Sequence, residues 1–134
     1  MITIPTAKFR GMTKDDWTSL PTATISSLFR QYTQGAYRNL LAIDIDVRYY
    51  KGNKLDQAPL GGLDMWLAFK FAFSTTSGGA TGSLQYAKEV QKGSYFFVYG
   101  IKKPLADKYY GNVTVTYKPA NGPAETKNKT MTWK

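Results

Sequence analysis

Hydrophobic and polar side chains alternate most regularly in residues 63–73 of the chain. Every odd position there carries a large apolar side chain: Leu63, Met65, Leu67, Phe69, Phe71 and Phe73. Successive side chains of a β-strand point to opposite faces, so the pattern predicts a strand that covers the core with one face. The other face is thinner and mixed in polarity, and it consists of Asp64, Trp66, Ala68, Lys70 and Ala72. This second face is available for a function.

The same period of two predicts further strands. Residues 41–50 and 113–118 alternate between apolar and polar side chains, and we expect a final strand over residues 127–134. Residues 95–99 are apolar on both faces, which is typical of a central strand covered on both sides. Residues 83–90 form a weaker candidate.

A helical period replaces the alternation near the N-terminus. Apolar residues recur at i, i+3, i+4 and i+7, which predicts a helix of about ten residues. These residues are Ile25, Leu28, Phe29 and Tyr32, and Gly35 follows them as a stop signal. An extended segment that crosses the sheet is the alternative.

Three other stretches have no strong period. Thr13 and the two acids after it indicate one short helical turn that ends before Pro21. We expect residues 1–12 to form an extended arm or a short edge strand. The small residues of 74–82 predict a loop that is mobile or shaped by a partner.

These elements together predict a mainly β protein, and a β-rich α+β fold is also compatible with them. We expect a single domain over residues 1–134, with an antiparallel sheet or β-sandwich of about 5–7 strands and one short helix near the N-terminus. The connections are too short for repeated helical crossovers, which favours antiparallel pairing. Residues 41–50 are expected to pair with residues 63–73 as a hairpin with a long loop.

The amino-acid composition excludes several classes of functional site, whereas no motif identifies one. The chain has neither cysteine nor histidine, which excludes disulfides, the usual zinc sites and Ser-His or Cys-His catalysis. Its glycine pairs lack the strand, spacing and helix of a phosphate-binding loop. Asp44 and Asp46 share one strand face and are the only foothold for metal or acid-base chemistry, although exposed acids on an alternating strand explain them more simply. We therefore expect no enzyme, no cofactor and no metal site.

Charge and targeting signals suggest a partner and a compartment. Lys and Arg outnumber Asp and Glu by 18 to 9, and the net charge of +9 favours contact with a polyanion such as nucleic acid, although scattered cations also serve solubility. The N-terminus lacks the pattern of a secretory signal, and no stretch approaches ~18 uninterrupted apolar residues. We expect a protein made in the cytoplasm without export and without membrane insertion.

Cations, hydroxyls and aromatic rings alternate with the core residues of three predicted strands. Such side chains on one sheet surface are what an unpaired nucleic-acid strand contacts, through phosphate neutralisation and base stacking. The candidate nucleic-acid-binding residues are Arg48, Tyr50, Trp66, Lys70, Thr114, Thr116 and Lys118. Asp44, Asp46 and Asp64 on the same faces would oppose a polyanion unless Lys70 or Arg48 pairs with them. The solvated side of a half-buried sheet is the plainer interpretation.

The physical class of the chain leads to one main hypothesis and two alternatives. The main one is a structural protein of a virus or phage, a coat subunit that self-assembles into a homo-oligomer or particle, resides in the virion and contacts enclosed RNA or DNA through non-specific phosphate contacts. Ten tyrosines, which suit interfaces, support this hypothesis. The alternatives are a single-stranded nucleic-acid-binding protein that does not assemble, and a β-sandwich module that binds carbohydrate or a cell surface.

Overall fold

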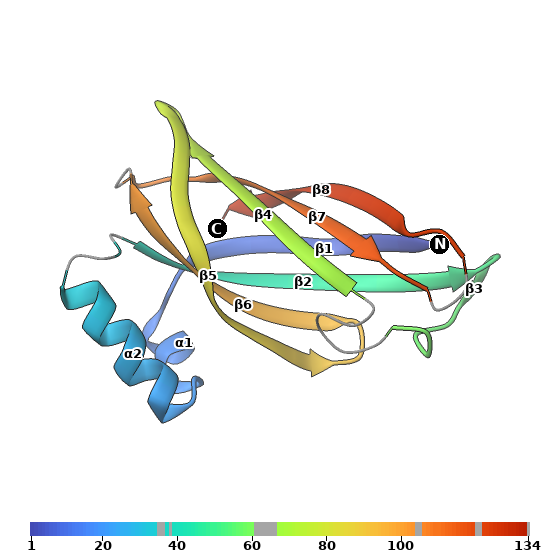
Figure 1. Ribbon diagram of the computed structural model, residues 1–134, viewed down its shortest axis with the longest axis horizontal. Coiled ribbons are helices and arrows are strands. Elements are labelled where there is room, and N and C mark those ends of the chain that lie inside the picture. The colour runs from blue at the N-terminus through green and yellow to red at the C-terminus, as the bar shows by residue number, and fades with distance from the viewer. Residues whose placement is uncertain (35–36, 38, 61–66, 104–105, 120–121, 134) are drawn as a thin grey trace.

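Strands make up most of the structure, which is a computed structural model. It describes all residues except 35–36, 38, 61–66, 104–105, 120–121 and 134. The elements follow the chain in this order: β1 (Ile2–Gly11), α1 (Lys14–Thr18), α2 (Thr22–Thr33), β2 (Asn39–Lys51), β3 (Lys54–Leu55), β4 (Leu67–Thr75), β5 (Gly78–Gln91), β6 (Ser94–Lys103), β7 (Tyr110–Tyr117) and β8 (Glu125–Trp133) (Figure 1). The prediction of a mainly β protein is confirmed.

The sheet closes on itself through β1. Neighbouring strands follow the order β1-β8-β7-β4-β5-β6-β2-β3, and β1 also pairs with β2. The result is a seven-stranded barrel to which β3 adds a short edge, rather than a plain sandwich or an open sheet. The pairing of β1 with β8 is parallel, whereas the other pairings are antiparallel.

The alternating residues of the strands fill the barrel as their period predicts. Leu67 and Phe73 of β4 are buried, and Phe69 between them packs its ring 5.0 Å from Tyr95 and 4.9 Å from Phe97. Aromatic pairs at these separations stabilise a core beyond the area that they bury. β6 lies between β5 and β2 and is covered on both faces, which confirms the prediction for residues 95–99.

Two local expectations are wrong and a third is only partly met, because each depended on neighbours that the local pattern does not specify. β2 pairs with β1, β3 and β6, and not with β4, so no hairpin joins residues 41–50 to residues 63–73. Residues 74–82 are no loose loop, because a turn at Thr76–Ser77 connects the ends of β4 and β5 as a hairpin. For residues 1–12 an extended arm or a short edge strand was expected; residues 2–11 form a strand, and it has a neighbour on each side.

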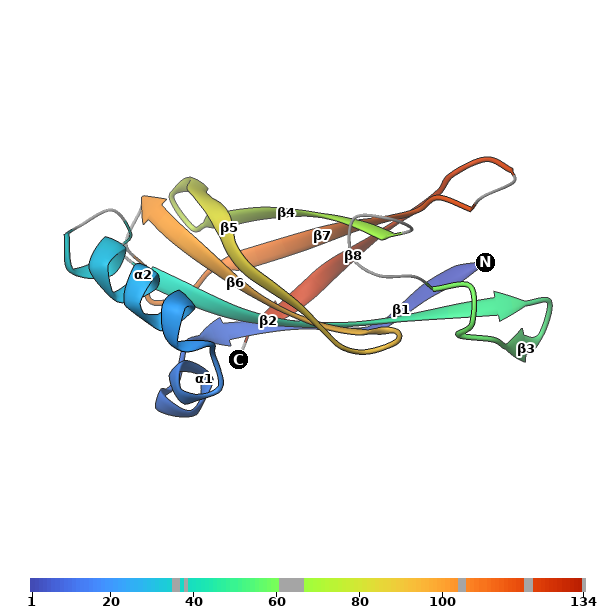
Figure 2. The same cartoon turned by 60° about the horizontal axis from the view of Figure 1, so that its bottom comes forward.

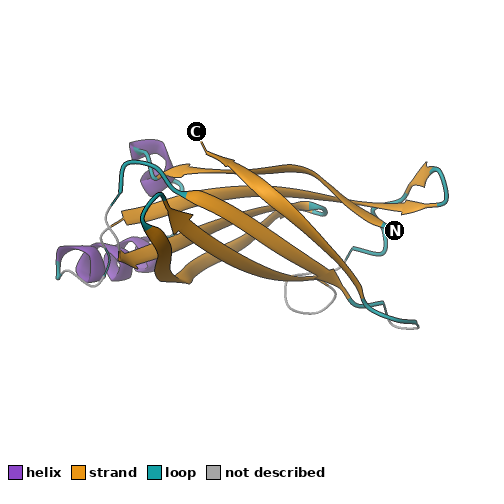
Figure 3. Ribbon diagram, turned by 90° about the horizontal axis from the view of Figure 1, so that it is seen from above, coloured by secondary structure: helices purple, strands orange, loops and turns teal. Residues whose placement is uncertain are grey.

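Both helices lie at one end of the barrel (Figure 3). Helix α2 confirms the predicted helical period, and Leu28 is buried on its inner side against a cluster that includes Leu40 and Val98. Phe29, which the same period placed on the apolar side, is instead 62% exposed. Helix α1, which has five residues and Thr13 as its N-cap, confirms the short helical turn expected there. Within the described residues, no helix is long and apolar enough to cross a membrane.

Arg10 fastens α1 to the barrel. Its guanidinium donates hydrogen bonds of 2.6 Å to Asp16 in α1 and of 2.6 Å to Asp44 in β2. Asp16 also accepts a hydrogen bond from the Thr13 N–H group, which completes a capping box at the start of α1. Burial acts to raise the pKa of Asp16, but the hydrogen bonds from Thr13 and Arg10 outweigh it and lower the pKa below the usual 3.8.

Replacing Leu67 by Ala should lower the free energy of unfolding by about 2–5 kcal/mol, because this side chain is only 1% exposed. Leu84→Ala is the matched control, since Leu84 is 43% exposed and should cost less than about 1 kcal/mol. Urea denaturation of both variants measures the difference. Equal losses would show that β4 does not face the core.

Replacing Asp16 by Asn should destabilise the protein by at least about 1 kcal/mol at neutral pH, because the helix cap and the Arg10 ion pair are both weakened. The pKa of Asp16 is lower in the folded than in the unfolded chain, so its contribution is complete above the unfolded pKa and is lost as the pH falls through the folded one. Unfolding free energies of the two proteins should therefore converge below about pH 4. Asp15→Asn, an exposed acid of the same turn, is the control. A gap that persists in acid would contradict this role for Asp16.

Candidate nucleic-acid interface

Strands β4, β7 and β8 form one wall of the barrel whose outward side chains are polar or small. Their register sets Lys70 beside Thr114 and Thr114 beside Asn128 in one row across the three strands. Residues opposite each other in antiparallel strands point to the same face, so the outward positions form a grid. We call this grid the outer three-strand face, and it consists of Ala68, Lys70, Ala72, Asn112, Thr114, Thr116, Thr126, Asn128 and Thr130.

Hydrogen bonds between the strands hold the polar groups of this face in place. The Asn128 amide donates to the Thr114 hydroxyl at 2.8 Å, and the Thr116 and Thr126 hydroxyls lie 3.3 Å apart. Side chains fixed in this way lose less conformational entropy when they bind a partner. The face is therefore an ordered array of hydroxyl and amide groups.

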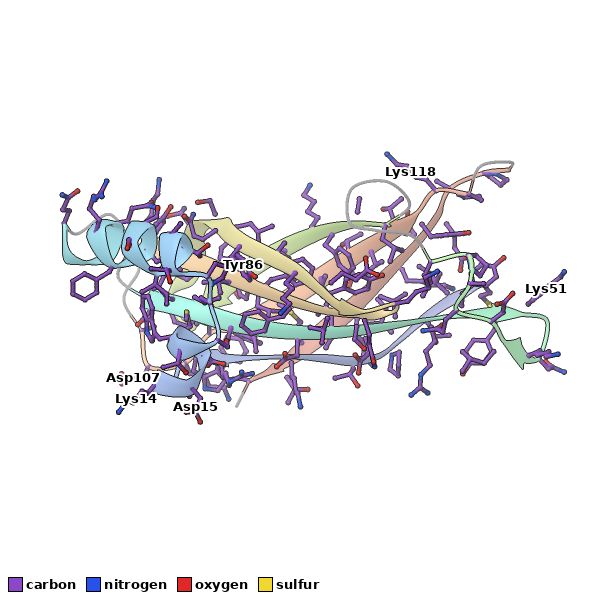
Figure 4. The ribbon with its side chains drawn as sticks, turned by 90° about the horizontal axis from the view of Figure 1, so that it is seen from below. Lys14, Asp15, Lys51, Tyr86, Asp107 and Lys118 are labelled. Carbon is purple, nitrogen blue, oxygen red and sulfur yellow. The ribbon has the colours of Figure 1, made fainter. Side chains whose placement is uncertain are left out.

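The charge on this wall is positive. Lys70 is exposed at its centre, and the exposed Lys118 follows the end of β7. Glu125 is the only acid within β4, β7 and β8, and its carboxylate already accepts a hydrogen bond of 2.9 Å from the Ile2 N–H group. Figure 4 shows Lys118 well away from Asp15 and Asp107, which lie at the helical end.

An aromatic ring completes the face at its other end. Tyr110 begins β7 on the outward side, pairs with Ser74 and is 47% exposed. The Lys108 ammonium lies 5.3 Å from the centre of this ring, a cation–π distance. A shallow cavity of about 220 Å³ adjoins the ring and is lined by Ala72, Phe73, Ser74, Tyr110, Gly111 and Asn112.

The structure divides the predicted site. Lys70, Thr114, Thr116 and Lys118 come together, as the alternation predicts. Arg48 and Tyr50 lie on β2, which β1 and β8 separate from β7 around the barrel. Trp66 lies outside the described residues. The expectation that all of these residues share one surface is wrong, because closure of the barrel turns the outward side of β2 in another direction.

Sequence reasoning missed part of the face, although a signal was present. Thr126, Asn128 and Thr130 alternate along the last strand, and this strand was predicted without assigning its outward residues. Assigning them required knowing that β8 lies beside β7. Tyr110 was not assigned individually, because the expectation rested only on the number of tyrosines.

Asp44 of β2 lies in a different environment. The Arg10 guanidinium donates a hydrogen bond to the Asp44 carboxylate. Arg10 and Asp44 line a cavity of about 360 Å³ beside α1, and Tyr86, Lys88 and Phe96 form part of its other walls. The guanidinium offsets the negative charge of Asp44, as expected of a structural ion pair. No group of three His, Cys, Asp or Glu side chains that could hold a metal ion occurs in the part of the chain that the structure describes.

Comparison of the chain with family models, with curated protein sequences and with solved structures found no match. The functional argument therefore depends on the residues of this chain alone.

Proposed function

We propose that the chain is a self-assembling structural subunit that contacts nucleic acid, as the coat protein of a virus or phage does. The outer three-strand face is the contact surface. One observation carries the proposal: Lys70 lies within an ordered array of hydroxyl and amide groups, on a wall whose only acid is already hydrogen-bonded.

A single nucleic-acid strand fits the dimensions of this face. Tyr110 and Lys118 are separated by the length of β7, roughly 25 Å at the rise of a β-strand. Lys70 and Lys118 neutralise phosphates, and the threonine and asparagine groups donate to phosphate and sugar oxygens. Tyr110 offers a ring on which a base stacks, with the Asn112 amide beside the adjoining cavity. These contacts make binding largely independent of sequence.

Large apolar side chains exposed away from this face support contacts between subunits. Phe29 lies on α2 and is 62% exposed, whereas Leu55 lies on β3 and is 48% exposed. Helix α2 and strand β3 occupy opposite ends of the long axis (Figure 1). Val90 of β5 is a third such residue, at 61% exposure. Single exposed apolar residues are common on proteins, so these three are positions at which a subunit contact can be tested rather than a defined interface.

Replacing Lys70 and Lys118 together by Ala should weaken binding of a single-stranded oligonucleotide and flatten its salt dependence. Each lost phosphate contact removes about 0.7 from the slope of log affinity against log salt, so the pair should remove about 1.4. Fluorescence anisotropy with labelled dT and rU oligonucleotides over a series of KCl concentrations measures this slope.

The double variant Arg48→Ala, Lys51→Ala is the matched control, because it removes the same charge from β2, on another side of the barrel. An equal loss of slope in the control would show that the attraction comes from net charge and not from this face. Tyr110→Ala should lower affinity without changing the slope, since stacking releases no counterions.

The purified protein should form uniform large particles that contain nucleic acid. Light scattering and negative-stain microscopy measure their size, and the ratio of absorbance at 260 and 280 nm reports the nucleic acid. A small species that binds oligonucleotides would favour the non-assembling alternative. A small species indifferent to nucleic acid and to salt would favour the surface-binding module.

A further inference from the structure

The barrel wall is incomplete between β1 and β8. The two strands pair only at Lys8 with Thr132 and at Phe9 with Trp133. Nearer the N-terminus they diverge (Figure 2), and a side chain replaces the ladder where Glu125 accepts the Ile2 N–H group. Between these two connections lies an open, shallow groove of about 430 Å³. We call it the β1–β8 seam, and it is lined by Met1, Ile2, Thr3, Ile4, Lys127, Asn128 and Lys129.

The sequence of β1 explains why the seam is open. The pairing of β1 with β2 shifts register between Thr3 and Thr6, so that β1 contains one residue more than β2 there. Such a bulge bends the strand that contains it. Pro5 lies in this bulge and has no N–H group to offer to β8. The edge of β8 that faces away from β7 is therefore without a strand partner from Glu125 to Met131.

Two lysines stand at positions of β8 that would face the core of a closed barrel. Lys127 is directly opposite Val115 and Lys129 is directly opposite Val113, and both valines are fully buried. The lysines are nevertheless exposed, because the seam is open beside them. Closing the wall would bury two ammonium groups without partners, at a high cost in free energy. The seam thus combines a free strand edge, two cations roughly 7 Å apart and a floor formed by the buried Ile2 and Ile4.

We propose that the seam is a docking site for an extended acidic segment of a partner protein. The segment adds as a strand to the free edge of β8, where main-chain hydrogen bonds hold it. Acidic side chains two residues apart lie on one face of such a strand and meet Lys127 and Lys129. The required pattern is acid, any residue, acid.

The geometry favours a peptide from another protein over two rival occupants. A polynucleotide offers the negative charges but no regular series of N–H and C=O groups for a strand edge. A second copy of this chain contains the acidic spacing at Asp44-Ile45-Asp46, but that segment is central in β2, with β1 on one side and β6 on the other. Lys127 and Lys129 are also separate from the proposed nucleic-acid contact at Lys70, because their side chains lie on the opposite face of the wall.

The test uses a fluorescein-labelled heptapeptide of alternating Glu and Val, with Glu at both ends, bound to the full-length chain. Its affinity should fall at least about tenfold in Lys127→Ala, Lys129→Ala and stay within about twofold in the control Lys70→Ala, Lys118→Ala, which has the same net charge. Glu125→Gln should strengthen binding, because it removes a negative charge beside the peptide. A peptide of the same composition with its four Glu residues in one block, and one with alternate backbone nitrogens methylated, should both bind weakly.

Three results would overturn the proposal. The first is that the methylated peptide binds as tightly as the unmethylated one, and the second is that a dT oligonucleotide that binds the same lysines displaces the alternating peptide. Either result would show that the seam is a general polyanion site. Aggregation of Lys127→Ala, Lys129→Ala with unchanged peptide affinity would mean that the lysines only protect an exposed strand edge. In that case Lys127→Gln, Lys129→Gln, which stays polar, should remain monodisperse and bind the peptide as the wild type does. Failure of all these tests would leave the proposal for the outer three-strand face standing, because the variants at Glu125, Lys127 and Lys129 change none of the residues of that face.

Discussion

The double pairing of β1 is the constraint on which the rest of the structure depends. This strand lies between β2, which is the next strand in the sequence, and β8, which is the last described strand. Without β1 the sheet would have two long open edges, and its inner face would be exposed along both. With it, the alternating residues of seven strands enclose one aromatic-rich core. The outward faces then point in different directions around the barrel, and this division decides which polar residues can act together.

The contrast between Lys70 and Arg48 shows how far the sequence could predict the candidate site. Both are the outward residues of clearly alternating strands, and the inward residues beside them were assigned correctly. Alternation is a local property, so strand faces could be predicted from it. Which strands are neighbours is a non-local property. Lys70 meets Thr114 because β4 pairs with β7, whereas Arg48 lies across the barrel on β2. The same limit explains the missed role of Asn128 and the mistaken hairpin between residues 41–50 and 63–73.

Strand β8 contains two surfaces of different chemistry in one short sequence. The side chains of its even-numbered residues, such as Asn128, belong to an ordered polar grid, whereas those of Lys127 and Lys129 belong to the opposite face of the strand. All three residues adjoin the opening in the wall. Because side chains alternate between the two faces of a strand, β8 can contribute to the proposed nucleic-acid contact with one face and to the proposed peptide contact with the other. A variant that neutralises all lysines of this region together would not distinguish the effect of the outer three-strand face from the effect of the β1–β8 seam. Separating odd from even positions follows directly from the pleat.

Because β8 closes the barrel, the barrel can close only late in the synthesis of the chain. β1 and β2 leave the ribosome early and can form their antiparallel pair at once, but the strand that closes the barrel is the last of the eight to be made. Until then β1 presents an unpaired edge, and the apolar interior is open beside it. The contacts between the first and last strands span more than a hundred residues, and such distant pairings form slowly. A nascent chain of this protein therefore spends most of its synthesis as an open sheet, and chaperones that shield strand edges would matter most during that interval.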